Sequence, residues 1–337
     1  MDRSLAALVP EHHHAEVDVA LAAVFGARRP EHAELLHGGV SGALIVRLTL
    51  GSTYSVLRLE PTRIALEHRE RHFAAMTAAA EAGAAPAVWF ADAETGVSVM
   101  NFVPARPLGE HPGGPLGLAR ALGVLLARVR GAAPFADFGP YPALIGGLLA
   151  SPTVSGRFPD ADIERCREGL ARISGALTWD QPQVSTHNDV SPRNLLFDGA
   201  RLWLVDWELA WRSDPMVDLA IASTELTVGE ALERALLSAS FGRAPDKALL
   251  ARLAITRLLT RLAYGAIVFD SLPPTPDRLA DALTPEGFRA AITGGHLAPG
   301  SRDIAAAFAR MSLAEFLRGV EAREFGELLA RAGQATV

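Results

Sequence analysis

Three polar residues between positions 185 and 220 have the types and the spacing that a magnesium–phosphate site needs. Asp189 is followed five residues later by Asn194, and Asp206 ends an apolar segment. Magnesium prefers oxygen ligands and is usually held by one or two protein groups together with substrate phosphates. Asn194 and Asp206 can supply those oxygens, while Asp189 can accept the proton of a substrate hydroxyl. Each residue alone is typical of a cap or a turn, but the combination indicates phosphoryl transfer.

The chain around these residues is expected to form loops and short strands. Pro192 blocks a helix interior and biases Ser191 towards extended geometry. LLF and GARLWLV are typical of two strands joined by a turn at Asp198-Gly199, and the second strand delivers Asp206 at its end. We therefore expect the two acids and the amide to converge on one edge of a small hairpin.

The combined motif HNDVSPRNLLF followed by LWLVDWELAWRSDPMVDLA resembles the aminoglycoside phosphotransferase and choline kinase family of kinase-like small-molecule phosphotransferases. Its DWE…DP..DLA form resembles the choline kinase-like branch. The resemblance implies ATP as phosphate donor and Mg²⁺ as cofactor. It also implies Asp189, Asn194 and Asp206 as catalytic residues, the last two as metal ligands, with Asp206-Trp207-Glu208 in the position of the kinase Asp-Phe-Gly. His187 resembles a residue that orients the loop.

The same resemblance implies an α+β, bilobal, protein-kinase-like fold. A small amino-terminal lobe, residues 1–103, would hold an antiparallel sheet and a helix that cover the nucleotide. A larger, mostly helical lobe, residues 104–337, would hold the catalytic loop and the substrate pocket. The glycine- and proline-rich tract 109–117 is typical of a boundary region.

Residues in the amino-terminal part are predicted to bind the nucleotide. A glycine-rich loop that includes Ser41 and Gly42 precedes a β-hairpin, and such loops let backbone N–H groups approach phosphate. The second strand of the hairpin carries Arg58. The only lysine in the chain is Lys247, so a phosphate-binding cation in this part must be an arginine. Choline kinase-like proteins are similar in using arginine here; the alternative is an exposed strand arginine.

Two further predictions concern the helix after Pro61 and the strand that follows it. Protein kinases pair their strand cation with a helix glutamate, so we expect Glu70 or Glu67 to pair with Arg58, and motif position favours Glu70. Asn101 and Val103 match by position the hinge of kinase-like folds, whose backbone groups bind the adenine edge.

The acceptor is predicted to enter beside Asp189, in a pocket walled by Trp207, Glu208, Trp211 and Tyr264. Trp207 is also expected to lie partly in the core, and Trp203 to lie in the core. Aromatic rings near carboxylates suit a small cation, which favours an amino alcohol such as choline or ethanolamine. An aminoglycoside or another hydroxylated metabolite is the alternative acceptor. A catalytically silent nucleotide-binding protein is a third hypothesis.

Composition limits the other classes. The net charge of -6 and the pI near 5.9 argue against a nucleic-acid surface. Arginines interrupt the long apolar runs, so no membrane span is expected, and no signal peptide is visible at the amino terminus. The single cysteine, Cys166, excludes an internal disulfide. The expected location is the cytoplasm, and the expected partner is a small-molecule alcohol.

Overall fold

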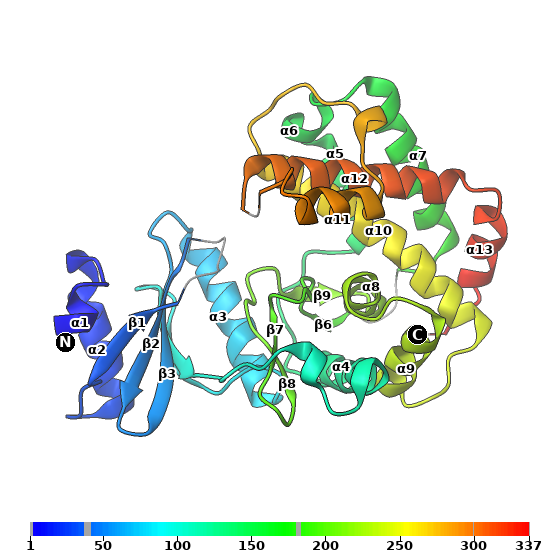
Figure 1. The fold of residues 1–337 in the computed structure, drawn as a ribbon. Coiled ribbons are helices and arrows are strands. Elements are labelled where there is room, and N and C mark those ends of the chain that lie inside the picture. Colours follow the sequence, from blue (N-terminus) through cyan, green and yellow to red (C-terminus); the bar gives the residue numbers. More distant parts are fainter. Residues whose placement is uncertain (1–2, 37–41, 180–182, 299, 337) are drawn as a thin grey trace. The chain divides into compact units, whose positions relative to one another are not determined.

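The computed structural model describes residues 3–36, 42–179, 183–298 and 300–336, and combines antiparallel strands with many helices (Figure 1). Close packing divides the chain into two compact units. The first unit comprises residues 1–136, 184–212 and 239–241, and the second comprises residues 137–183, 213–238 and 242–337. The predicted catalytic stretch therefore belongs to the same unit as the amino-terminal sheet. The predicted lobe boundary after residue 103 stays a prediction.

The first unit is built on a five-stranded antiparallel sheet with the order β1-β2-β3-β5-β4. Its strands are β1 (His32–Leu35), β2 (Leu44–Leu50), β3 (Thr53–Leu59), β4 (Val88–Asp92) and β5 (Val97–Asn101). Gly51 and Gly96 have positive φ angles of 61° and 74° and make the turns of the two hairpins. Glycine adopts this conformation without the clash that a Cβ would cause, so these positions fix where each hairpin folds.

The two faces of this sheet have different roles. One face carries buried Val46, Leu48 and Leu57, which pack with Leu5 of α1 (Arg3–Ala6) and Leu21 of α2 (His14–Phe25). Successive side chains of a strand alternate between faces, so burying this set fixes the register.

The opposite face carries Arg58. In the register of the sheet, Ile45, Arg58 and Ser98 form one row, and Arg47, Val56 and Met100 form the next. The helix α3 (Leu66–Glu81) follows β3 in the chain and contributes His72, which contacts Glu60.

The remainder of the first unit includes the predicted catalytic residues and the short strands that flank them. It contains α4 (Gly114–Arg130), β6 (Val184–Thr186), β7 (Leu195–Phe197), β8 (Leu202–Leu204) and the start of β9 (Trp211–Ser213), with short 3-10 turns at Glu11–His13 and Leu108–Glu110. β6 pairs with β9. β7 and β8 pair antiparallel, with Leu195 opposite Leu204. The predicted hairpin with its turn at Asp198-Gly199 is therefore confirmed.

Trp203 does not lie in the core, contrary to the expectation from the sequence. Leu202 and Leu204 are buried while Trp203, between them on β8, is only half-buried. Its indole Nε1 donates to Asp198 Oδ2 at 2.8 Å, and the Arg201 guanidinium lies 3.7 Å from its ring centre. Strand alternation places it on the outer side of a two-stranded hairpin, which explains the difference.

The second unit is helical. Its helices are α5 (Tyr141–Ala150), α6 (Pro152–Ser155), α7 (Asp160–Ala176), α8 (Met216–Glu225), most of α9 (Glu230–Phe241), α10 (Lys247–Ser271), α11 (Pro285–Thr293), α12 (Arg302–Glu321) and α13 (Phe325–Ala332), with a 3-10 turn at Leu279–Asp281. α10 packs against α5, α8, α12 and α13. Asp246 caps its start by accepting from the Leu249 N–H at 2.8 Å. A Cβ at Gly265 would lie 2.8 Å from Leu313, so glycine permits the close approach of α10 to α12.

None of the helices that the structure describes combines the length and apolar character needed to cross a bilayer.

The carboxyl end of α10 depends on a buried arginine. Arg157 Nη2 donates to the carbonyl oxygens of Phe269, Leu272 and Pro273 at 3.4, 3.2 and 2.7 Å. Its Nη1 donates to Thr275, and the guanidinium lies 4.7 Å from the Phe269 ring centre. The last carbonyls of a helix have no partner within it, so this one side chain satisfies several of them.

We expect Arg157→Ala to lower the free energy of unfolding by about 3 kcal/mol, because buried carbonyl groups lose their donors. Urea unfolding measures this. Arg289→Ala is the control, since Arg289 forms an exposed pair with Glu286 that contributes less than about 1 kcal/mol. Equal losses in the two variants would contradict the capping role.

Candidate active site

The loop between β6 and β7 brings Asp189 and Asn194 into direct contact. Asn194 Nδ2 donates to Asp189 Oδ2 at 2.6 Å and to the Asp189 main-chain oxygen at 3.0 Å. The Asn194 N–H donates to the Ser191 carbonyl, which closes the turn around Pro192. The amide nitrogen of Asn194 is thus used to orient Asp189, and its Oδ1 remains the atom that can be offered to a cation.

Asp206 lies beside this loop. The Val205 N–H donates to the main-chain carbonyl of Asn194 at 3.0 Å, so the residue before Asp206 is hydrogen-bonded to the main chain of the predicted metal-binding residue. Asp206 has a φ of 67°, a left-handed conformation that costs a non-glycine residue about 1–2 kcal/mol. The two acids and the amide that the sequence singled out are therefore brought together within the first unit.

Asn188, the residue before Asp189, has a φ of 60°. Among the described residues, it is the other non-glycine residue with a positive φ besides Asp206. Its side chain compensates for this conformation: Nδ2 donates to the Leu209 carbonyl at 3.1 Å, and Oδ1 accepts from Thr186 Oγ1 at 3.0 Å. Strained backbone of this kind is concentrated at functional sites. Both strained residues adjoin or belong to the predicted catalytic set.

His187 joins the two sides of the loop. Its Nδ1 accepts from the Asp189 N–H at 3.2 Å, so the ring proton lies on Nε2, which donates to the Val205 carbonyl at 3.0 Å. The side chain is fully buried, and its ring centre lies 4.6 Å from that of Trp207. Since both ring nitrogens bond to the main chain, His187 is placed as the loop-orienting residue that the sequence suggested.

Arg58 is buried, 6% exposed, and two of its nitrogens have acidic partners. Nε donates to Glu60 Oε1 at 2.7 Å, and Nη1 donates to Asp206 Oδ1 at 3.3 Å. Within the described residues Nη2 is buried and has no acceptor. A buried donor without a partner costs about 1–3 kcal/mol, so Nη2 is the atom that a phosphate oxygen could satisfy.

The predicted pair between Arg58 and a helix glutamate is not formed, and Glu60 takes its place. Glu67 and Glu70 are both exposed on α3, whereas the buried Glu60 lies at the end of β3. The helix contributes His72 instead, whose Nδ1 lies 3.2 Å from Glu60 Oε1. Residues two positions apart on an α-helix, such as Glu70 and His72, are separated by about 200° of rotation. Glu70 therefore points away from the side that carries His72.

Burial alone would raise the pKa of Glu60. The hydrogen bond with His72 and the positive charge of Arg58 outweigh burial and lower this pKa to about 2. Glu60 is therefore a carboxylate at every physiological pH.

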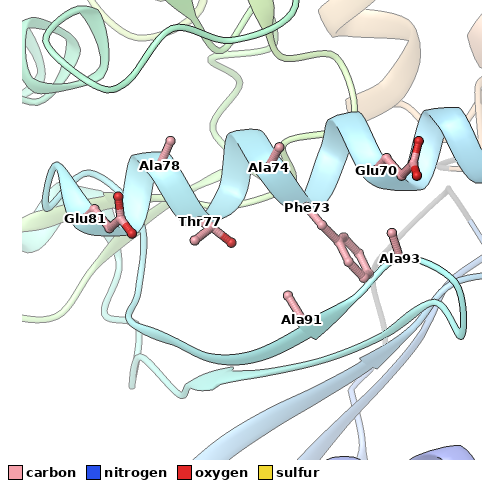
Figure 2. Close-up of a pocket in the computed structure, with 8 residues that line it drawn as sticks. All are labelled: Glu70, Phe73, Ala74, Thr77, Ala78, Glu81, Ala91 and Ala93. Atoms are coloured by element: carbon pink, nitrogen blue, oxygen red, sulfur yellow. The ribbon is translucent and has the colours of Figure 1, made fainter.

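Glu70 lines a separate pocket of about 440 Å³ on the surface between α3 and the β4 hairpin. Figure 2 shows Phe73 pointing from the helix towards Ala91 and Ala93, with Glu70 and Glu81 near the two ends of the hollow. The predicted nucleotide-binding role of Glu70 has no support in this placement.

Glu208 lies in the electrostatic field of the predicted catalytic acids. Burial raises its pKa to about 7, and the negative charges of Asp206, Glu60 and Asp189 add to the effect while Arg58 opposes it. Its main-chain oxygen accepts from Arg71 Nη2 at 3.0 Å. The predicted substrate-side carboxylate thus interacts electrostatically with both predicted catalytic acids.

The three aromatic residues predicted near the acceptor lie in different surroundings. Trp211 is half-buried, and its main-chain oxygen accepts from Thr186 Oγ1 at 2.7 Å and Asn188 Nδ2 at 3.4 Å, which holds it beside the catalytic loop. Trp207 is 1% exposed and packs edge-on against Phe135, so it is entirely a core residue and cannot line the acceptor pocket. Tyr264 lies on α10 in the second unit, and its part in the site stays a prediction.

The predicted hinge has groups suited to a purine. The Asn101 N–H donates to the Ala87 carbonyl, so it serves the sheet. Within the described chain no main-chain oxygen accepts from the Val103 N–H. On the Arg58 face of the sheet, Ile45, Val56 and Met100 are partly exposed apolar residues. This face therefore offers an apolar surface near one available N–H.

Of the predicted phosphate loop, Ser41 lies outside the described residues. Gly42 has a φ of 81°, and a Cβ there would lie 2.9 Å from Arg63 Nη2, so the position favours glycine.

The donor set fits magnesium. No cluster of three His, Cys, Asp or Glu side chains capable of holding a metal occurs in the parts of the chain that the structure describes. Magnesium in phosphoryl transfer does not need one, because phosphates and waters complete its coordination. The Asp206 carboxylate, 25% exposed, and Asn194 Oδ1 are the oxygens suited to this role.

A family model described as "Phosphotransferase enzyme family" matches residues 32–255, which include Arg58, Asp189, Asn194, Asp206 and Glu208 but not Tyr264. The chain belongs to this phosphotransferase family. The predicted family is thereby confirmed, and the protein is a small-molecule phosphotransferase. Among curated protein sequences, none matches it.

Solved structures show the same fold. The phosphotransferase is similar to a choline/ethanolamine kinase family protein from Mesorhizobium loti, with a TM-score of 0.66 and 24% identity over 96% of this chain and 100% of the other. Choline kinase LicA from Streptococcus pneumoniae gives 0.60 and 14%, covering 90% and 100% of the two chains. Macrolide 2′-phosphotransferase MphH from Brachybacterium faecium gives 0.57 and 17%, covering 88% and 97%. The predicted kinase-like fold class is confirmed.

The sequence interpretation missed the contribution of Glu60 and His72. A weak signal was present, since strand alternation places Glu60 on the same side as Arg58. The partnership with a histidine from α3 depends on how the helix packs, which no local pattern specifies.

The lowered pKa of Glu60 predicts a pH-dependent stability. A carboxylate with a depressed folded-state pKa stabilises the fold above its unfolded pKa, and this contribution is lost as pH falls through the folded value. From 4.5 to about 2, the contribution near pH 7 is at most about 3 kcal/mol. We expect Glu60→Gln to destabilise the protein near pH 7 and to differ much less from the unchanged protein near pH 3. Urea unfolding at both pH values measures this, with exposed Glu67→Gln as the control. A penalty that is the same at both pH values would contradict the assignment.

Proposed function

We propose that this protein transfers the γ-phosphate of ATP to the hydroxyl group of a small molecule, and that the acceptor is an amino alcohol such as choline or ethanolamine. The observation that carries the proposal is the contact of Asn194 with Asp189, next to an Asp206 that is paired with Arg58. The Val205 N–H donates to the Asn194 carbonyl, and this main-chain hydrogen bond links the segment of Asp206 to that of Asn194 in the first unit.

Asp189 would accept the proton of the acceptor hydroxyl. The oxygen of that hydroxyl would attack the γ-phosphorus of ATP, and the bond between the γ-phosphorus and the bridging oxygen would break to release ADP. The hydrogen bond from Asn194 Nδ2 to Oδ2 fixes the plane of the carboxylate. Positioning of this kind supplies much of the rate enhancement in phosphoryl transfer, because little covalent work falls to the protein.

Asn194 and Asp206 would hold Mg²⁺, which neutralises charge on the phosphates when it is bound. Arg58 Nη2 would donate to a phosphate oxygen, since it has no acceptor within the described residues whereas Nε and Nη1 already donate to Glu60 and Asp206. The apolar residues on the Arg58 face and the Val103 N–H would receive the adenine ring. Related folds support nucleotide binding, since LicA has been solved in complex with AMP.

The acceptor class follows from charge and shape near Asp189. Glu208 supplies a carboxylate and Trp211 a half-buried ring beside the catalytic loop. A cation over an aromatic ring gains about 0.5–2 kcal/mol, so an ammonium group suits this wall. Proteins with this fold include a choline/ethanolamine kinase family member, which supports the same class.

An assay of ADP release over a panel of acceptors tests the function. We expect choline, ethanolamine or a related amino alcohol to stimulate ADP release in the presence of Mg²⁺·ATP. Asp189→Ala should lower this turnover by about two orders of magnitude or more, with nucleotide affinity changed little. If only an aminoglycoside or a macrolide stimulated ADP release, the acceptor would be that class of compound and not an amino alcohol. ATP binding without stimulation by any hydroxyl compound would indicate a catalytically silent protein.

Asp206→Ala tests the metal site. The substitution removes a carboxylate ligand, so ATP affinity should lose its dependence on Mg²⁺. Calorimetric titration of ATP with and without Mg²⁺ measures this. Asp198→Ala is a control, since Asp198 is an acid of the β7–β8 turn that contacts Ala200, Arg201 and Trp203. A variant at position 206 whose ATP affinity still increases with Mg²⁺ would remove Asp206 from metal binding.

A further inference from the structure

The arginine of the candidate phosphate site is held by a buried chain of three side chains. Arg58, Glu60 and His72 are 6%, 4% and 4% exposed. Glu60 Oε1 accepts from Arg58 Nε at 2.7 Å and lies 3.2 Å from His72 Nδ1. A single carboxylate oxygen therefore joins a strand cation to a helix side chain.

The backbone holds this carboxylate in place. Glu60 follows the last residue of β3, and its N–H donates to the Gly96 carbonyl at 2.9 Å. A Cβ at Gly96 would lie 3.3 Å from the Glu60 Cβ, so the turn of the β4–β5 hairpin packs directly on this residue. Glu60 is therefore held in place by the sheet while its carboxylate contacts both Arg58 and His72.

The geometry points to Glu60 and His72 as positioning residues for nucleotide binding, a role that rests on the proposed function. Glu60 orients the Arg58 guanidinium so that Nη2 is left for a phosphate oxygen, and His72 fixes Glu60 from α3. The acid that orients the arginine thus comes from the strand, and the helix supplies a hydrogen-bond donor to it. The helix glutamates Glu67 and Glu70 take no part.

Three observations support this assignment over a purely structural one. Of the three guanidinium nitrogens of Arg58, Nε and Nη1 donate to Glu60 and Asp206, whereas the buried Nη2 has no acceptor within the described residues and is left for a ligand oxygen. Arg58 also pairs with Asp206, so its orientation and the candidate metal ligand are coupled. The third partner, His72, comes from a helix whose acids are exposed on other sides.

The first experiment compares Mg²⁺·ATP affinity by calorimetry, without an acceptor, in Glu60→Gln and in its matched control Glu70→Gln. Glutamine keeps the shape of the side chain and removes the charge. We expect the dissociation constant to rise about tenfold or more in Glu60→Gln and to stay within about twofold in Glu70→Gln. Equal affinities in the two variants would overturn the inference.

The second experiment moves the acid to the helix. In the double variant Glu60→Gln with His72→Glu, a carboxylate from position 72 faces Arg58, and we expect it to recover a large part of the ATP affinity that Glu60→Gln loses. His72→Glu alone places two acids together and should bind ATP more weakly than either the unchanged protein or the double variant. No recovery in a double variant with an unchanged melting temperature would contradict the orienting role.

A third pair of variants keeps the test valid should Glu60→Gln fail to fold. His72→Gln retains a donor to Glu60, whereas His72→Leu does not, and both keep the bulk of the side chain. ATP affinity should be kept in the glutamine variant and weakened about threefold or more in the leucine variant. Titration of the unchanged protein distinguishes the two possible failures. If it binds no Mg²⁺·ATP, the proposed function fails. If it binds Mg²⁺·ATP but the paired variants do not differ in affinity, only the positioning role of Glu60 and His72 fails.

Discussion

A buried guanidinium is the constraint on which the arrangement of the first unit depends. Removing a cation from water costs several kcal/mol unless charged partners compensate. Burial would lower the pKa of Arg58, but the charges of Asp206 and Glu60 outweigh it and raise the pKa. These two acids are far apart in the sequence. Keeping Arg58 charged therefore requires that the end of β3 and the segment after β8 meet, and this meeting assembles the candidate site.

Acids outnumber cations in this part of the described chain. Asp206, Glu60 and Glu208 act on the Arg58 guanidinium, and Arg71 contacts the Glu208 main chain. Burial raises the pKa of Glu208, and the negative charges of Asp206, Glu60 and Asp189 add to the effect. A protein with no ligand to bind would gain stability by losing one of these acids. The excess is instead suited to a divalent cation with a nucleotide, and to an acceptor that carries an ammonium group. The electrostatics thus agree with the chemistry of the Asp189–Asn194 contact.

The sequence predicted those features that local patterns determine. The turn at Asp198-Gly199 and the β7–β8 hairpin follow from turn chemistry and alternation, and the contact of Asn194 with Asp189 follows from a short loop around Pro192. The expectations for the two tryptophans failed for different reasons. Alternation with the buried Leu202 and Leu204 places Trp203 on the outer side of β8. Trp207 lies beyond the end of β8, after the left-handed Asp206, so the alternation of the strand does not determine its burial. Single-sequence patterns do not reveal a strained residue of this kind.

The partner of Arg58 was the other failure, and its cause is the geometry of a helix. Motif position favoured Glu70, yet a helix of 3.6 residues per turn presents one side to its neighbour. On α3 the buried residues include His72, Phe73, Ala75, Met76 and Ala79. Glu70 lies outside this side, so it could reach Arg58 only if the helix turned and exposed those residues to water. Hydrophobic burial therefore decides which polar side chain meets Glu60, and it selects a histidine. Once the helix presents a donor in place of an acid, the compensating charge must come from the strand itself, which is where Glu60 stands.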